Sequence, residues 1–213
     1  MDYMTDKLSI IVPTLWRVKN FHKILEEISN NDCVGEIILI DNTETPLELN
    51  IKKLIHVKEN KNTFVYPAWN KGYQMSKFDK LCFLNDDISF DYNLLCYILP
   101  HVTEEKGMIG LWEFHGSPIN RDNSGLGIAP INHRNSGFGC LWFINKKTYT
   151  EIPEDMKVWY GDDWLFNKLR GKNYGIYNLE INGVTSATSN HPEFDKIKSE
   201  DSKAFHGRHK SGN

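Results

Sequence analysis

The sequence lacks the features that mark membrane proteins, zinc proteins and dinucleotide-binding enzymes. No apolar run in its 213 residues approaches the roughly 18 residues of a membrane span, and its start lacks the charged-then-apolar layout of a signal peptide. Residues 14–17, after the first expected strand, contain no Gly, which excludes a GxGxxG dinucleotide loop and disfavours a sugar nucleotidyltransferase. The four cysteines form no CxxC pair, so we expect a reduced, cytoplasmic protein without a zinc site: Cys33, Cys82, Cys96 and Cys140.

Charge of neither sign dominates the sequence. Lys and Arg number 25 against 28 Asp and Glu, for a net charge of −3. Nothing general therefore favours nucleic acid as a partner. With 40% hydrophobic and 25% charged residues, the composition is that of a globular protein. We expect a single domain over residues 1–213.

Apolar runs alternate with amphipathic stretches along the first half of the chain. Strands are expected at 8–14, 36–42, 54–57, 80–88 and 107–112, and helices at 17–29, 66–77 and 92–102. This alternation predicts an α/β fold with a mostly parallel central sheet flanked by helices. Residues 113–137 lose the periodicity and are interpreted as a substrate-facing loop. Further expectations are strands at 138–144, 171–177 and 179–184, a short helix at 145–151, a helix opened by two acids, and a frayed polar tail.

Three oxygen-bearing side chains follow the apolar run at 80–84. Alternate residues of an extended chain point to the same side, so Asn85 and Asp87 can face one ion while Asp86 faces away or reaches a neighbouring group. Oxygen ligands of this kind suit Mg²⁺ or Mn²⁺. The alternative is a turn at Asn85 and Asp86 that caps a helix after Ile88.

Acidic side chains recur at two other element ends. Asp41 ends the second expected strand, and Asp162 and Asp163 open a helix, where helix-dipole capping is the alternative function. Trp159 and Trp164 flank this pair and suggest a flat-walled sugar pocket, although we expect one of the two to fill core instead.

The order and intervals of these motifs resemble the inverting nucleotide-sugar glycosyltransferases of family 2, which have the GT-A fold. The resemblance covers about residues 8–177. It implies a nucleotide-binding half at about 8–112, an acceptor half at about 113–190 and a polar C-terminal tail at 191–213. The matching segments are Val12-Pro13-Thr14 with Arg17, Asp41, Asn70-Lys71-Gly72, Asn85-Asp86-Asp87 with Asn for the first acid of Asp-x-Asp, Gly137 to Trp142, and Gly161-Asp162-Asp163.

The resemblance assigns a function to each of these segments. It implies that Asp163 is the catalytic base, with Asp162 as the alternative, and that Asp87 holds Mn²⁺ or Mg²⁺ with help from Asn85. His191 is a candidate third ligand by analogy with some GT-A enzymes, and a surface histidine is the alternative. Gly139 belongs to the sugar pocket with the two Trp residues. The expected donor-binding residues are Pro13, Thr14, Arg17, Asp41, Asn70, Asn85 and Asp86.

The resemblance also implies the substrates. A UDP-sugar is the default donor because Asp41 can accept a hydrogen bond from a uracil N–H, although an acid can pair with guanine as well. The acceptor is a hydroxyl of a glycan, glycolipid, protein or modified phage DNA base, so nucleic acid enters only as an acceptor. Donors for the acceptor or a phosphate stand in the long loop at His115, Arg121, His133 and Arg134. A carbohydrate-binding protein that has lost catalysis is the alternative, and a peripheral membrane or host-cytoplasm location is compatible with these substrates.

Overall fold

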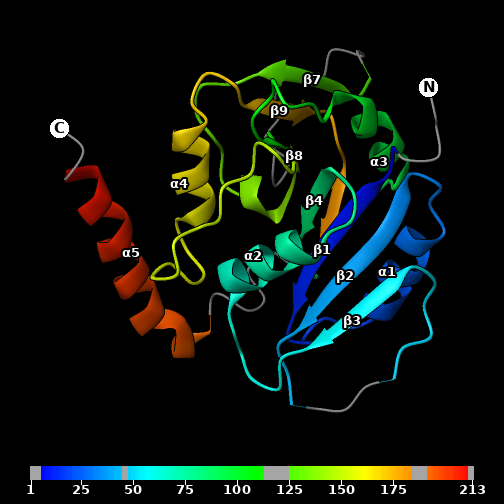
Figure 1. Ribbon diagram of the computed structural model, residues 1–213, viewed down its shortest axis with the longest axis horizontal. Coiled ribbons are helices and arrows are strands. Elements are labelled where there is room, and N and C mark those ends of the chain that lie inside the picture. The colour runs from blue at the N-terminus through cyan, green and yellow to red at the C-terminus, as the bar shows by residue number, and fades with distance from the viewer. Residues whose placement is uncertain (1–5, 45–47, 113–124, 184–190, 211–213) are drawn as a thin grey trace.

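The computed structural model describes residues 6–44, 48–112, 125–183 and 191–210. Its centre is a sheet of eight strands in the order β3-β2-β1-β4-β8-β6-β9-β7 (Figure 1). The strands are β1 (Leu8–Thr14), β2 (Val34–Asp41), β3 (Leu54–Lys58), β4 (Lys80–Leu84), β6 (Ile109–Leu111), β7 (Gly127–Pro130), β8 (Leu141–Asn145) and β9 (Tyr174–Tyr177). Four neighbouring pairs are parallel and three are antiparallel, which confirms the predicted mostly parallel sheet.

Helices cover both faces of the sheet (Figure 1). On one face, α1 (Phe21–Ser29) and α3 (Asn93–Ile98) pack on alternate residues of β1, β2 and β4. On the other face lie α2 (Val65–Met75) and α4 (Gly161–Lys168). β1, β2 and β4 are almost continuously apolar because both of their faces are buried, which is why continuous runs rather than alternation identified them. No helix in the described part of the chain combines the length and apolar character of a membrane span.

A second, small sheet consists of two strands that are distant in the sequence. It pairs β5 (Ile88–Phe90) with β10 (Ile181–Gly183) in an antiparallel arrangement. A turn at Asp86 and Asp87 leads into this strand, and α3 begins only at Asn93 with Tyr92 at its N-cap, so the alternative in which Asn85 and Asp86 cap a helix is wrong. The predicted strand at 179–184 is confirmed as β10.

Two predictions of local structure are wrong. After β8, which ends at Asn145, residues 146–148 form a turn in place of the predicted helix at 145–151; the Asn145 side chain accepts the N–H of Lys147 at 3.0 Å, a local bond that competes with helix formation. The C-terminal segment is not frayed: it forms a short 3₁₀ turn (Pro192–Phe194) and the helix α5 (Asp195–Lys210). Phe194, Asp201 and Phe205 of this segment are buried against the domain. Two further 3₁₀ turns lie at Leu99–His101 and Phe138–Cys140.

The expectation of four reduced cysteines is also wrong. Cys33, in the turn after α1, and Cys96, in α3, form a disulfide across 63 residues. Both elements pack on the same face of the sheet, which brings the two residues together without any local sequence signal. Cys82 and Cys140 carry free thiols.

Candidate active site

A pocket of about 340 Å³ opens at the carboxyl ends of the parallel strands. The pairing of β1 with β4 ends at Ile11 and Phe83, whereas the pairing of β1 with β2 continues to Thr14 and Asp41. The strands on either side of β1 thus diverge at the point where the strand order reverses, which is where open α/β sheets bind ligands. The predicted residues that line it are Pro13, Thr14, Asn85, Asp86, Asp87, Gly139, Trp159, Asp162 and Asp163.

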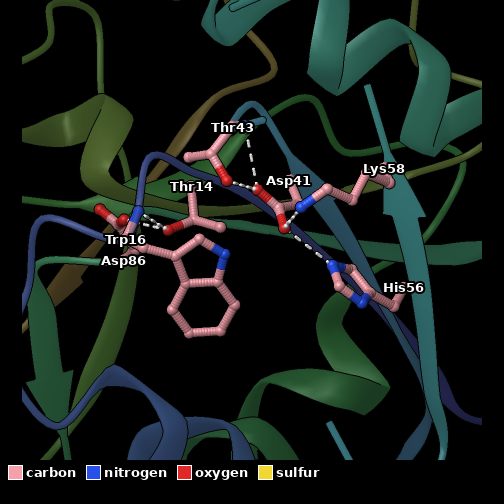
Figure 2. Close-up of polar contacts among 7 residues, drawn as sticks. All are labelled: Thr14, Trp16, Asp41, Thr43, His56, Lys58 and Asp86. Atoms are coloured by element: carbon pink, nitrogen blue, oxygen red, sulfur yellow. Dashed lines mark hydrogen bonds and ion pairs between the residues drawn. The ribbon is translucent and has the colours of Figure 1, made fainter. Parts of the chain in front are cut away.

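Thr14 and Asp86 join the ends of β1 and β4. The Thr14 hydroxyl donates to Asp86 Oδ2 at 2.6 Å, and its oxygen accepts the Trp16 N–H at 2.9 Å (Figure 2). Burial raises the pKa of Asp86 to about 6; the hydrogen bond from Thr14 opposes this change and the charge of Asp87 adds to it. Asp86 is therefore turned toward the protein, as expected for the middle residue of the motif.

The donor set of the pocket fits a divalent cation. Four carboxylates and one guanidinium are the charged groups of the described lining, so a nucleoside diphosphate would meet net negative charge there unless a cation accompanied it. Asn85 and Asp87 offer the hard oxygens that Mn²⁺ or Mg²⁺ prefers. Within the described ranges no three His, Cys, Asp or Glu side chains cluster as a closed metal cage, so such an ion would take most of its ligands from substrate and water.

Arg134 bridges the two acids at the start of α4. Its Nε and Nη2 donate to the two carboxylate oxygens of Asp163, and its Nη1 lies 3.0 Å from Asp162 Oδ2. Although burial acts in the opposite direction, the charges of both acids raise the pKa of Arg134 above its ordinary value. The sequence identified Arg134 only as one of four donors in the long loop. Of the other three, His115 and Arg121 lie outside the described residues, and His133 is exposed.

The two acids differ in their surroundings. Asp162 is 10% exposed at its side chain and accepts a hydrogen bond from the Tyr66 hydroxyl at 3.0 Å. Burial raises the pKa of Asp162, and the charge of Arg134 opposes the change. Asp163 is 26% exposed and faces the pocket. The structure therefore distinguishes two carboxylates that the sequence could not order.

Gly139 is required by its contact with this pair. A Cβ atom at Gly139 would lie 2.3 Å from Asp162 Oδ2, and one at Gly161 would lie 2.6 Å from the Tyr66 ring. Real Cβ contacts are never this close, so a side chain at either position would displace the acid or the ring that holds it. Gly139, the residue predicted for the sugar pocket, and Gly161 thus leave the space that Asp162 and Tyr66 occupy.

Aromatic residues also line the pocket. Phe64, Trp159, Tyr160 and Phe194 all line the pocket. Phe64 and Tyr160 both have φ of 68°, in the region that favours glycine, which costs about 1–3 kcal/mol each. Each directly precedes a helix, α2 or α4. Trp164 lies outside this lining with the Lys168 ammonium 5.1 Å from its ring centre, so only one of the two predicted Trp residues faces the pocket.

Asp41 lies beside the pocket, beneath its lining. Its carboxylate accepts hydrogen bonds from the N–H of Thr43 at 3.0 Å and from the hydroxyl of Thr43 at 2.7 Å (Figure 2). It also contacts His56 Nε2 at 2.9 Å and Lys58 Nζ at 3.4 Å. Burial opposes ionisation, but the hydrogen bonds from Thr43 and His56 outweigh it and lower the pKa of Asp41. Asn42, the next residue, reaches the lining instead.

Three other predicted residues also lie outside the described lining. Arg17 pairs with Glu193 at 2.5 Å. The amide of Asn70 donates to Ile152 O at 2.8 Å and accepts from the hydroxyl of Tyr149 at 2.7 Å, so it joins α2 to the chain after β8. His191 is 59% exposed, with Nδ1 3.7 Å from Glu193 Oε2. Their predicted functions in donor or metal binding stay predictions.

Solved structures with a similar fold include a mannosyltransferase. The crystal structure of S. aureus TarS 1–349 is similar with a TM-score of 0.59 and 13% identity over 79% of this chain and 57% of that one. The structure of TarS 1–349 in complex with UDP-GlcNAc is similar with a TM-score of 0.58 and 16% identity, over 79% of this chain and 55% of that one. The mannosyltransferase PcManGT from Pyrobaculum calidifontis, in complex with GDP-Man and Mn²⁺, is similar with a TM-score of 0.52 and 14% identity, over 78% of this chain and 53% of that one. The chain thus spans little more than half of these structures.

Sequence comparison gives the family. No protein of curated function matches the sequence significantly. The profile of the family described as Glycosyl transferase family 2 matches residues 9–154, well over half of the chain. The match includes β1, β2 and the Asn85–Asp87 motif and ends shortly before α4. The chain therefore belongs to glycosyl transferase family 2, with the GT-A fold.

Proposed function

We propose that this chain transfers a sugar, with inversion, from a nucleoside diphosphate sugar to a hydroxyl acceptor. The observation that carries the proposal is the pocket itself, which brings the Asn85–Asp87 motif and the Asp162–Asp163 pair into one cavity from distant parts of the sequence. A donor diphosphate near the first group would leave its sugar facing the second. Residues 8–112 would then bind the donor, and residues 113–190 would supply the acceptor side.

Asp163 is the proposed base. It is the more exposed of the two acids, whereas Asp162 is buried and hydrogen-bonded by Tyr66. The acceptor oxygen would form the new bond to the anomeric carbon as the bond to the diphosphate oxygen breaks, and the hydroxyl proton would go to Asp163. Arg134 orients the carboxylate by its two-pronged contact, so little reorganisation is needed in the transition state.

Asp87 and Asn85 are the proposed holders of Mn²⁺ or Mg²⁺. A divalent cation there would stabilise the charge that develops on the leaving diphosphate. The excess of carboxylates in the lining supports this requirement. Asp86, which is hydrogen-bonded to Thr14, would keep the motif in position rather than ligate directly.

A UDP-sugar remains the default donor, and its base would lie beside Asn42, Asn62 and Phe64. For the nucleotide base to contact Asp41, one of its N–H groups would have to donate to a carboxylate that already accepts hydrogen bonds from Thr43 and His56. Among the acceptor classes, a glycan, glycolipid or protein hydroxyl is favoured. The acidic lining around Asp163 disfavours a nucleic-acid acceptor, whose phosphates it would repel.

A thermal-shift panel tests the proposal. UDP, GDP and their sugar conjugates are each added with and without Mn²⁺, and a ligand that binds the folded state raises the melting temperature. We expect one nucleotide to stabilise the protein and Mn²⁺ to increase the shift. No shift with any nucleotide in either condition, but a shift with free glycans, would instead indicate a carbohydrate-binding protein without catalysis.

The substitution Asp163→Asn then tests the base. Transfer should fall by at least about 100-fold, while the nucleotide-induced thermal shift stays within experimental error, because the change removes proton acceptance and keeps the shape. Glu154→Gln is the matched control, since Glu154 is an exposed acid a few residues earlier. Turnover retained in Asp163→Asn would rule out this residue as the base.

A further inference from the structure

The carboxylate of Asp201, in α5, binds three consecutive backbone N–H groups of another segment. Lys157 N donates to Oδ1 at 3.0 Å, and Val158 N and Trp159 N donate to Oδ2 at 2.8 and 2.9 Å. Asp201 is 0% exposed. A buried carboxylate that accepts several N–H groups is a strong and directional anchor, because each bond is charge-assisted and shielded from water.

The next turn of α5 contacts Tyr160, the residue that follows Trp159. The ring of Phe205 stacks on that of Tyr160, with 5.2 Å between ring centres and 17° between planes. Tyr160 has the left-handed backbone conformation that starts α4, and no side-chain hydrogen bond caps this helix. A conformation that an aromatic residue rarely adopts persists only where its surroundings impose it. Here the anchored amides on one side and the stacked ring on the other impose it.

The anchored segment leads directly to the catalytic acids. Asp162 and Asp163 lie two and three residues beyond Tyr160, in the first turn of α4. The carbonyl oxygen of Lys157 also accepts the N–H groups of Val65 and Tyr66, both at 3.0 Å. Tyr66 in turn binds Asp162. A displacement of residues 157–160 would therefore shift the acid pair in two ways. One is through the chain that runs from Tyr160 into α4, and the other is through the hydrogen bonds that join Lys157 to Tyr66 and Tyr66 to Asp162.

We propose that Asp201 is a positioning residue for the acid pair. In this proposal α5 supports the active site and is not merely a C-terminal tail. The catalytic consequence rests on the proposed function; the anchoring does not. Asp201→Asn should loosen residues 157–160 and misplace Asp163. The binding of the diphosphate and the metal should change less than kcat, because Thr14 ends β1 and Asn85 directly follows β4, and these strands pair with their neighbours in the central sheet rather than with the anchored segment.

Amide hydrogen exchange tests the anchoring directly. In Asp201→Asn, the amides of Lys157, Val158 and Trp159 should exchange at least about tenfold faster than in the wild type. Asp195→Asn is the control, because Asp195 is an exposed acid on the same helix. Phe205→Leu, a milder change, should loosen the same amides if Asp201→Asn does not fold. Unchanged exchange in the folded variants would overturn the proposal.

Kinetics then tests the positioning. We expect kcat of Asp201→Asn to fall about 10- to 100-fold, with the Kd for UDP and Mn²⁺ changed less than about threefold, as for a misplaced base. Fast amide exchange with wild-type kcat would overturn the positioning role. If the wild type itself transfers no sugar from any donor, the proposed function fails, and faster exchange in Asp201→Asn still supports the anchor.

Discussion

Replacement of Asp86 by Asn removes a charge that the fold buries between β1 and β4. Burial is the main reason that the pKa of Asp86 is raised to about 6 in the folded protein. In the unfolded chain an Asp titrates near pH 4. The folded protein therefore keeps a proton that the unfolded chain releases, and the stability of the wild type falls as pH rises from about 4 to about 6.

The size of the effect follows from the two pKa values. Their difference corresponds to about 3 kcal/mol of folding free energy above pH 7 and to about 0.5 kcal/mol at pH 4. The amide oxygen of Asn can still accept the hydrogen bond from Thr14, which is 2.6 Å long in the wild type. Asp86→Asn should thus be more stable than the wild type by up to about 3 kcal/mol at pH 7.5, with little difference at pH 4.

Urea unfolding at pH 4, 5, 6 and 7.5, with divalent cations removed, measures this difference. Asp32→Asn is the matched control, because Asp32 is exposed and the substitution should change stability by less than about 0.5 kcal/mol at each pH. A gain for Asp86→Asn that does not grow with pH would refute the argument from burial. Added Mn²⁺ should narrow the gap at pH 7.5, since a cation at Asp87 would offset the charge of Asp86.

Other perturbations test the contacts around the pocket. Gly139→Ala should lower the free energy of unfolding by about 1–3 kcal/mol because its Cβ would collide with Asp162, whereas Gly125→Ala, in open space, should not. Arg134→Met should cost about 3 kcal/mol by leaving two adjacent acids without their cation, and the exposed Arg170→Gln serves as its control in the same urea titration. Reduction of the disulfide, which spans 63 residues, should lower stability by about 4 kcal/mol, and an unchanged urea midpoint with dithiothreitol would contradict this.

The sequence predicted the strands that position one end of the pocket. Apolar runs identified β1, β2, β3 and β4, and the residues at the carboxyl ends of β1 and β4 line the pocket, at the point where the strand order reverses. This information is local, because a strand and its terminal side chains occupy adjacent positions in the chain. Asp41 shows the limit of such reasoning: it ends β2 as predicted, yet His56 and Thr43 surround its carboxylate.

The part of the pocket around Asp162 and Asp163 depends on contacts that no local pattern encodes. Arg134 reaches Asp163 from a loop without periodicity. Helix α5 is so polar that its buried face consists of few residues, and Asp201 in that face resembles any surface acid until its three N–H partners are known. The disulfide was missed for the same reason, because Cys33 and Cys96 meet only after α1 and α3 have packed on the sheet.

The pairing of β5 with β10 has a consequence for the order of folding. Ser89, two residues beyond Asp87, pairs with Asn182 across the small sheet, although the two are 93 residues apart in sequence. Contacts this distant form late, because closing a long loop costs entropy before the contact stabilises it. The β1–β2–β3 region can assemble from short-range crossovers, so the turn at Asn85–Asp87 should reach its final geometry only in the last kinetic phase, after these strands have paired.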